Sequence, residues 1–233
     1  MIAGLYIAVV LIGYLIGSIP FGLLIGRAFA KTDIRQVGSG KIGMTNVLRT
    51  AGKKAAVLSL VLDLSKGALA VIFAGLLFND YSAAATGGFT WLESAKVLAA
   101  LSAIAGHSWS IFLRFKGGRG VATFIGGLAV LYWPAAVVGG AFILGIGFRT
   151  KYMSLGSIIG AVTAFIMLMA LNILRINFLK PYPPFEYVVF SMIGAIFIYV
   201  MHRDNILRLF NGTERKIGEK AKAETSPSTN NPE

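Results

Sequence analysis

The 233-residue chain contains no cysteine, which excludes a disulfide framework, a thiolate metal site and a cysteine nucleophile. Acidic residues are also scarce, because 10 Asp and Glu stand against 22 Lys and Arg, and the formal net charge is +12. Charged residues make up 14% of the chain, whereas soluble domains carry roughly 25%. This composition does not predict a soluble globular domain.

Hydrophobic residues make up 56% of the chain, and the mean hydropathy is +0.73. Crossing about 30 Å of hydrocarbon takes roughly 20 helical residues. The first Lys or Arg is Arg27, so no basic segment precedes the first apolar run, and we expect this run to be an uncleaved span. We predict an all-α, polytopic integral membrane protein with residues 1–218 as a single domain. Apolar runs long enough to span lie near residues 2–26, 55–78, 95–113, 152–174 and 186–201.

A further apolar run, residues 121–148, is too long for one comfortable span and tight for two, and Trp133-Pro134 interrupts it. Basic loops stay in the cytoplasm, which places residues 31–54, 114–119 and 203–222 there. The loop before residue 121 and the segment after residue 201 can both lie in the cytoplasm only if residues 121–148 cross the membrane twice or not at all. We therefore predict a short hairpin and seven transmembrane helices with the N-terminus outside. Five helices plus a re-entrant loop are the alternative.

The loops on the outer side and the C-terminal tail complete the predicted topology. Residues 79–94 have no basic residue and fit the outer face, whereas Arg175 and Lys180 would lie outside against the rule. The polar residues 219–233 are predicted to form a disordered cytoplasmic tail. Because the basic residues stand in short segments between apolar runs, we expect anionic headgroups or phosphorylated metabolites as partners, and no nucleic acid.

The first basic loop contains the sequence GSGKIGMTN at residues 38–46, with Arg49 three residues later. Closely spaced glycines allow successive N–H groups to converge on an anion, and an arginine offers a bidentate fork. The spacing does not fit a nucleotide P-loop. A flexible turn is the simpler interpretation. The candidate phosphate-binding residues are Ser39, Gly40, Thr45, Asn46 and Arg49.

The second basic region, FKGGRGVAT at residues 115–123, stands where the chain enters the membrane again. Glycines and cations at a helix N-terminus favour a phosphate, because unpaired N–H groups and the helix dipole both attract an anion. Topology anchoring would explain the cations but not the glycines. The candidate phosphate-binding residues are Lys116, Gly117, Gly118, Arg119 and Gly120.

The third segment, HRDNILRLFNGTE at residues 202–214, follows the last span. On a helix, His202 and Asn205 share a face, so that an imidazole and an amide point at one substrate. An interfacial helix with Ile206, Leu209 and Phe210 facing lipid is compatible with this interpretation.

Asp63 and Lys66 lie one helical turn apart inside the second span. Ionisable residues within the membrane are expensive and are usually paired or functional. We favour a structural ion pair, with Lys66 also a candidate ligand for a substrate phosphate. The lone His107 is interpreted as a packing residue.

These segments together resemble the bacterial membrane glycerol-3-phosphate acyltransferases that use acyl phosphate. The resemblance covers residues 1 to about 220 and rests on the order of five segments. These are GSIPFG at residues 17–22, the first loop through Arg49, Asp63 with Lys66-Gly67, Gly106-His107 with FKGGRGVAT, and residues 202–214.

The resemblance implies transfer of a fatty acyl group from acyl phosphate to the 1-hydroxyl of sn-glycerol 3-phosphate. The products would be lysophosphatidic acid and phosphate, in the first step of phospholipid synthesis. It also implies a multi-pass enzyme of the bacterial inner membrane with its active site facing the cytoplasm. Ser39, His202 and Asn205 match functional positions and are our candidate catalytic residues, whereas Glu214 matches a structural one.

Three residues depart from the family pattern: Lys41 stands where Asn is usual, Met44 where Ala is frequent, and Arg119 where Lys is usual. As the base, either His202 or a substrate phosphate takes the hydroxyl proton. The backbone or Asn205 would stabilise the oxyanion. The H-x-x-x-x-D signature of other glycerolipid acyltransferases is absent, because Phe112 and Leu207 occupy the positions of its aspartate.

We expect no cofactor and no metal, because no carboxylate cluster suited to Mg²⁺ is visible. We also expect a monomer. A transporter or flippase for a phosphorylated solute or lipid is the competing class. Transporters usually place their site near the bilayer midplane, often within an internal repeat, and no convincing repeat is visible.

Overall fold

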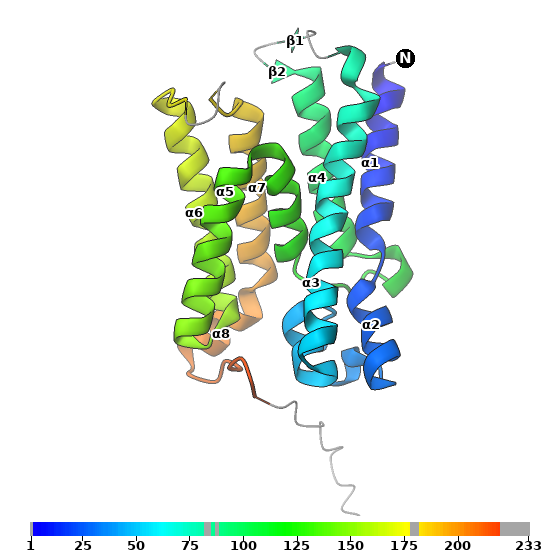
Figure 1. Cartoon of the computed structure of the whole chain (residues 1–233), viewed down its shortest axis with the longest axis vertical. Coiled ribbons are helices and arrows are strands. Elements are labelled where there is room, and N and C mark those ends of the chain that lie inside the picture. Colours follow the sequence, from blue (N-terminus) through cyan, green and yellow to red (C-terminus); the bar gives the residue numbers. More distant parts are fainter. Residues whose placement is uncertain (1, 82–84, 87–88, 178–181, 220–233) are drawn as a thin grey trace, which may run out of the picture.

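The computed structural model describes residues 2–81, 85–86, 89–177 and 182–219, and almost all of this part is helical (Figure 1). Strands β1 (Ala85–Thr86) and β2 (Phe89–Thr90) form a minimal antiparallel pair. The helices are α1 (Ile2–Ser18), α2 (Phe21–Ala30), η1 (Ile34–Gln36), α3 (Met44–Leu77), η2 (Asn79–Tyr81), α4 (Trp91–Ser108), η3 (Ile111–Leu113), α5 (Val121–Thr150), α6 (Met153–Ile173), α7 (Phe185–Met201) and α8 (Arg203–Phe210).

Five helical stretches in the described residues are long and apolar enough to cross a membrane, and a sixth arises if α7 and α8, bent by 58°, count together. The predicted all-α, polytopic class is therefore confirmed. The five stretches are Ile2–Ala30, Met44–Leu77, Trp91–Leu113, Val121–Thr150 and Met153–Ile173. Of the predicted tail, residues 220–233 lie outside the described residues, as does Lys180.

Two of the predicted boundaries are corrected. The first span is broken at Ile19-Pro20, because Pro20 caps α2. The end of the predicted first loop is helical, because α3 begins at Met44 rather than near residue 55. A kink at Gly52 separates the first two turns of α3 from the rest of the helix, and the φ of +83° at this residue suits a residue without a Cβ.

The chain reverses direction within α5 at Tyr132, where φ is −155° and ψ is 88°. Ile125 Cδ1 lies 3.7 Å from the position that a Cβ on Gly139 would occupy, although 14 residues of straight helix would separate them by about 21 Å. Figure 1 shows the two arms side by side in green. The predicted turn is thus confirmed, one residue before Trp133-Pro134, because a proline removes a helical hydrogen bond and clashes with the preceding turn.

Helices α1 and α4 pack with their backbones almost in contact. A Cβ on Gly17 would lie 2.1 Å from the Ala103 carbonyl oxygen, and one on Gly106 would lie 2.2 Å from the Tyr14 carbonyl oxygen. Small residues such as Gly17 thus allow this close contact between the two helices. At Gly22, in contrast, the close neighbour is the Ile42 carbonyl of the first loop.

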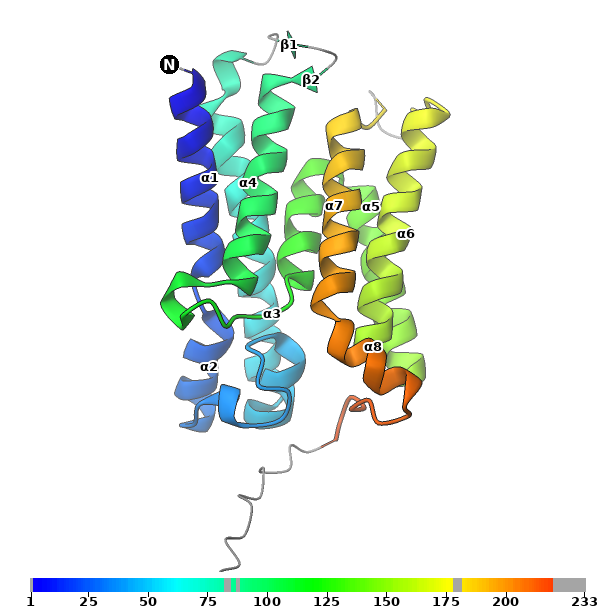
Figure 2. The ribbon, with the colours of Figure 1, turned by 180° about the vertical axis from the view of Figure 1, so that it is seen from behind.

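All three basic segments lie toward one end of the molecule. Figures 1 and 2 show the N-terminus, η2 and the β1–β2 pair at one end, and α2, the first loop and α8 at the other. The loop between α4 and α5 lies on the α8 side of the middle (Figure 2). The fold therefore brings the predicted motifs to the same half of the helical bundle.

We predict that Gly17→Ala lowers the thermal unfolding temperature in detergent, because the added methyl group cannot fit against Ala103. Overpacking of this kind costs about 1–3 kcal/mol. Gly4→Ala on the same helix is the matched control, since a Cβ there meets no atom within 4 Å. The control gains helix propensity and should unfold at or above the wild-type temperature. Equal stability of the two variants would contradict the close α1–α4 contact.

Candidate functional site

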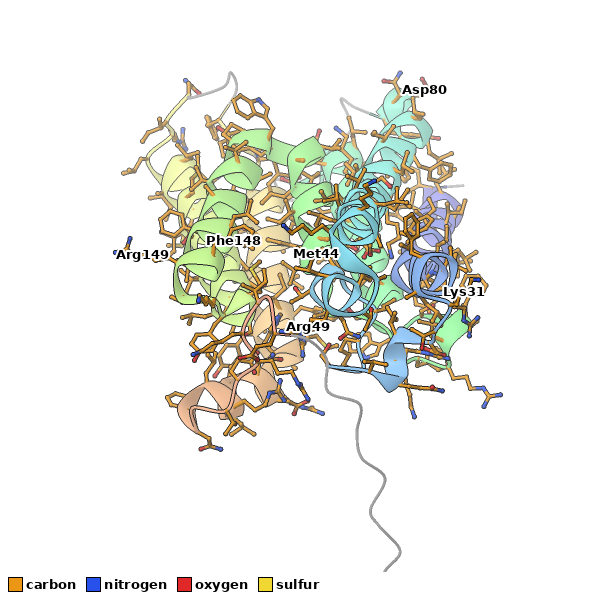
Figure 3. The ribbon with its side chains drawn as sticks, turned by 60° about the horizontal axis from the view of Figure 1, so that its bottom comes forward. Lys31, Met44, Arg49, Asp80, Phe148 and Arg149 are labelled. Carbon is orange, nitrogen blue, oxygen red and sulfur yellow. The ribbon has the colours of Figure 1, made fainter. Side chains whose placement is uncertain are left out.

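A cavity of about 240 Å³ lies between the first loop, the start of α3, both arms of α5, the start of α6 and the α7–α8 junction. Figure 3 shows Met44 and Arg49 near the middle of this end of the molecule, whereas Lys31 and Arg149 point outward at opposite edges. Three motifs that are far apart in the chain thus meet around one space.

Most of the predicted site residues line this cavity, but not all of them do. The residues of the cavity lining are Ser39, Thr45, Asn46, Arg49, Arg119, Gly120, His202 and Asn205, together with Asp63 and Glu214. The residues that the structure places elsewhere are Gly40, Lys66, Lys116, Gly117 and Gly118.

Asn46 holds the first loop in shape. Its Nδ2 donates to the carbonyls of Ile34 at 2.7 Å, Lys41 at 2.9 Å and Val37 at 3.1 Å, and its Oδ1 accepts from the Ser39 N–H at 3.0 Å. The side chain is 2% exposed and has no donor left for an anion. In this structure the Asn46 amide is used within the loop and positions Ser39 at the cavity.

Gly40 also has a conformational role. Its φ is +65°, it is exposed, and its N–H donates to the Val37 carbonyl at 3.3 Å. The predicted convergence of this N–H on a phosphate is not what the structure has. The first-loop residues left to face an anion are Ser39, Thr45 and Arg49.

Arg49 offers one edge of its guanidinium to the cavity. Its Nη2 donates to the carbonyls of Lys216 at 3.2 Å and Arg215 at 3.4 Å. Its Nε is buried and has no hydrogen-bond partner among the described residues. A buried donor without a partner is costly unless a ligand accepts from it.

The glycine-rich second loop serves two purposes. The N–H groups of Gly117 and Gly118 donate to the carbonyls of Ser108 and His107, both at 3.0 Å, so in this structure they bond within the protein and not toward the cavity. A Cβ on Gly118 would lie 2.0 Å from His107 Nε2, which explains the glycine by packing. Lys116 is exposed and lies outside the cavity lining.

The other purpose of this loop is to bring a cation into the cavity. Arg119 lines the cavity, and its Nε is buried without a partner among the described residues. Burial lowers the pKa of Arg119 to about 10, which still leaves the guanidinium charged at neutral pH. Gly120, with φ of +79°, then starts α5, whose first turn also faces the cavity through Val121 and Ala122.

His202 lies just after the last residue of α7 and is 2% exposed. Its Nδ1 is 2.7 Å from the Ile198 carbonyl oxygen, which can only accept, so Nδ1 carries the hydrogen and Nε2 is the acceptor. Burial and the charge of Arg119 lower the pKa of His202 to about 4. At neutral pH the ring is therefore uncharged.

Asn205 presents an oxygen to the cavity. Its Nδ2 donates to Glu214 Oε1 at 2.6 Å, which fixes the orientation of the amide because a carboxylate can only accept. Its Oδ1 is buried without a partner among the described residues. The atom of Asn205 that is left to face a ligand is therefore an acceptor, which suits a hydroxyl group better than an oxyanion.

Glu214 joins α6 to α8. Its Oε1 also accepts from Ser154 Oγ at 2.9 Å, and its Oε2 pairs with Arg208 Nε at 2.8 Å. This geometry agrees with the structural role that the resemblance implies for Glu214. Helix α8 itself turns Leu207 and Phe210 outward, whereas Ile206 and Leu209, which we expected to face lipid, are half-buried.

The Asp63–Lys66 pair is fully buried, and each side chain is 1% exposed. Lys66 Nζ lies 2.8 Å from Asp63 Oδ1, 2.9 Å from His107 Nδ1 and 3.0 Å from the Ile19 carbonyl oxygen. The ammonium thus forms an ion pair with Asp63 and hydrogen bonds with His107 and Ile19, which agrees with the structural interpretation of Lys66.

Sequence reasoning missed several residues of the cavity lining. Lys41 and Arg215 add cations, and His107, interpreted as a packing residue, also faces this space. Lys41 stood inside the first glycine-rich motif, so its position was a signal, whereas Arg215 follows the third motif without one. The apolar wall was missed as well. It consists of Leu60, Leu64, Ile125, Ile143, Leu144 and Met153.

Comparison with known proteins gives the same relatives by sequence and by structure. Residues 7–212 match the family model described as glycerol-3-phosphate acyltransferase. Glycerol-3-phosphate acyltransferase 3 of Dehalococcoides mccartyi (strain CBDB1) is 48% identical over 224 residues, which are 95% of this chain and 100% of that protein. The Rhodopseudomonas palustris (strain BisB5) enzyme is 42% identical, over 93% of this chain and 98% of its own.

The solved structures of PlsY (YgiH), an integral membrane glycerol 3-phosphate acyltransferase, are similar throughout. The glycerol 3-phosphate form has a TM-score of 0.75 at 32% identity and covers 91% of this chain and 96% of its own. The lysophosphatidic acid form has a TM-score of 0.75 at 31% identity, with 91% and 95% covered. By sequence and by fold, this chain belongs to the glycerol-3-phosphate acyltransferase family of integral membrane enzymes.

Proposed function

We propose that this acyltransferase takes its acyl group from acyl phosphate and transfers it to the 1-hydroxyl of glycerol 3-phosphate. The observation that carries the proposal is the lining of the cavity, which combines several cations with a set of apolar side chains. Both substrates bear a phosphate, and the donor also bears a hydrocarbon chain. The related structures hold glycerol 3-phosphate and lysophosphatidic acid, the acceptor and product of this reaction.

The apolar wall suits the acyl chain of the donor. Leu60 and Leu64 of α3 line the cavity together with Ile143 and Leu144 of α5, and Leu144 is 44% exposed. A chain lying here keeps its tail next to the lipid while its phosphate reaches Arg49 and Arg119. Arginine binds phosphate through two parallel N–H donors, which orients the group as well as holding it.

His202 and Asn205 suit the glycerol end of the acceptor. His202 Nε2 and Asn205 Oδ1 are two acceptors that line the same cavity, and glycerol 3-phosphate has two hydroxyl donors. Binding both hydroxyls would orient the 1-hydroxyl toward the acyl carbon. Orientation of this kind lowers the barrier because it replaces a collision between two free molecules.

A substrate phosphate is the better proton acceptor for this hydroxyl. The second pKa of a phosphate monoester is about 6, whereas the pKa of His202 is lowered to about 4 by burial and Arg119. The imidazolium would also stand beside the Arg119 charge. The developing oxyanion needs donors, and Arg119 Nε and the first turn of α5 at Val121 and Ala122 supply candidates.

We also propose seven membrane crossings with the N-terminus outside and the cavity facing the cytoplasm of the bacterial inner membrane. The reversal at Tyr132 allows two crossings within α5, and the three basic segments lie toward one end of the bundle (Figure 1). The first arm of α5, residues 121–131, is shorter than the roughly 20 helical residues that a full crossing takes.

The donor is tested by supplying the purified protein with glycerol 3-phosphate and either acyl phosphate or acyl-CoA of the same chain. We expect lysophosphatidic acid and one equivalent of phosphate from acyl phosphate, because the cavity offers cations for the phosphate of the donor. Heat-unfolded protein is the control. A higher kcat/KM with acyl-CoA would contradict the proposed donor.

The orientation is tested by single cysteines, since the natural chain has none. We expect Lys54→Cys and Thr213→Cys, both at exposed positions, to react only with reagents on the cytoplasmic side. Asp80→Cys at the opposite end, also exposed, is the matched control and should react from outside. Labelling of all three from the same side would refute the topology.

The role of His202 is tested by pH profiles of kcat. If a substrate phosphate is the base, His202→Gln should retain much of kcat, because an amide can still bind a hydroxyl, and the acidic limb near pH 6 should persist. A histidine base predicts instead a loss of about 10² to 10⁴ in kcat and a change in that limb. Asn205→Asp is the companion variant, since its carboxylate would face Glu214 and should raise the KM for glycerol 3-phosphate.

A further inference from the structure

Lys41 is a half-buried cation of the cavity lining to which no role has been assigned. No ion pair or side-chain hydrogen bond of Lys41 is found in the described part of the chain. The charges that face it are Arg119 from the second loop and Asp204 and Arg203 from the start of α8. Burial, followed by the charge of Arg119, lowers the pKa of Lys41.

The backbone of Lys41 is fixed on both sides. Its carbonyl accepts from Asn46 Nδ2 at 2.9 Å, and the next residue, Ile42, is 1% exposed in a cluster with Ile34 and Val47. A lysine on a mobile surface loop would turn its ammonium into water at little cost. Here the loop is held against the protein core, and the side chain stays at the cavity.

The charges around the cavity do not balance. Among its lining residues, the two carboxylates each have a cation partner of their own, Asp63 with Lys66 at 2.8 Å and Glu214 with Arg208 at 2.8 Å. Four lining cations remain, which are Lys41, Arg49, Arg119 and Arg215. A phosphate monoester carries about −1.5 to −2 charges at pH 7, so two of them together carry about −3 to −4.

We infer that Lys41 binds a substrate phosphate and completes a set of four cations matched to two phosphates held at the same time. The inference rests on the proposed function, because it requires both substrates to be phosphorylated. It also implies direct transfer within a ternary complex. The bond between the acyl carbon and the donor phosphate breaks as the bond to the glycerol oxygen forms, and the hydroxyl proton passes to a phosphate.

The test is steady-state kinetics of Lys41→Met, with each substrate varied in turn. We expect the KM for glycerol 3-phosphate or for acyl phosphate to rise about tenfold or more, the effect of losing one charge-assisted hydrogen bond. Whichever KM rises identifies the phosphate that Lys41 binds. Lys41→Arg, which keeps the charge, should restore most of the loss. Lys53→Met removes an exposed cation outside the cavity lining and should leave both KM values unchanged.

A second measurement needs no variant. Acylation of lysines by acetic anhydride, quantified by mass spectrometry, should be slower at Lys41 when glycerol 3-phosphate or inorganic phosphate is present, and unchanged at Lys53. Unchanged KM values in Lys41→Met together with equal labelling of Lys41 with and without either ligand would overturn the inference. Wild-type protein that yields no lysophosphatidic acid from acyl phosphate would instead refute the proposed function.

Discussion

The contacts of the buried Lys66 ammonium group are the interaction on which the packing of this end of the molecule depends. An unpaired charge inside a membrane protein is expensive. Lys66 forms an ion pair with Asp63 of α3 and hydrogen bonds with His107 of α4 and with the carbonyl of Ile19, where α1 ends. One buried cation therefore ties three helices together directly behind the cavity. Gly118 packs on the ring of His107, which is one of the partners of Lys66. The position of this ring therefore also sets the path of the chain to the next residue, Arg119. Removing one partner of such a pair costs roughly 3–5 kcal/mol, since the other charge is left buried.

The cations of the protein fall into two groups that differ in their partners. Lys66 and Arg208 are paired with carboxylates and hold helices together, whereas Arg49 and Arg119 each keep a buried Nε without a partner among the described residues. The first group holds helices together. The second group offers the donors that the proposed substrate phosphates would need, because a buried donor costs free energy unless a partner accepts from it.

Sequence alone predicted the features that depend on composition and order. Hydropathy located the spans, and the requirement that all basic loops face one side predicted the reversal found at Tyr132. It also named ten of the residues that line the cavity. It could not show that the donors of Asn46, Gly117 and Gly118 bond within the protein, because the sequence does not tell which acceptor lies next to a donor. A glycine that lets backbone approach a phosphate and one that lets it approach an imidazole look the same until the neighbour is known.

Asn205 illustrates how much of the chemistry rests on such neighbours. The sequence predicts an amide in the site but not which end faces the ligand, and Glu214 decides this by accepting from Nδ2. Oδ1 of Asn205 and Nε2 of His202 are acceptors, which suit hydroxyl groups, whereas the arginines of the same lining are donors, which suit phosphate. Under the proposed chemistry, a glycerol phosphate then has one favourable orientation. The donor is already activated as a mixed anhydride, so the main task left to the protein is to hold the two substrates close together in the orientation that reacts.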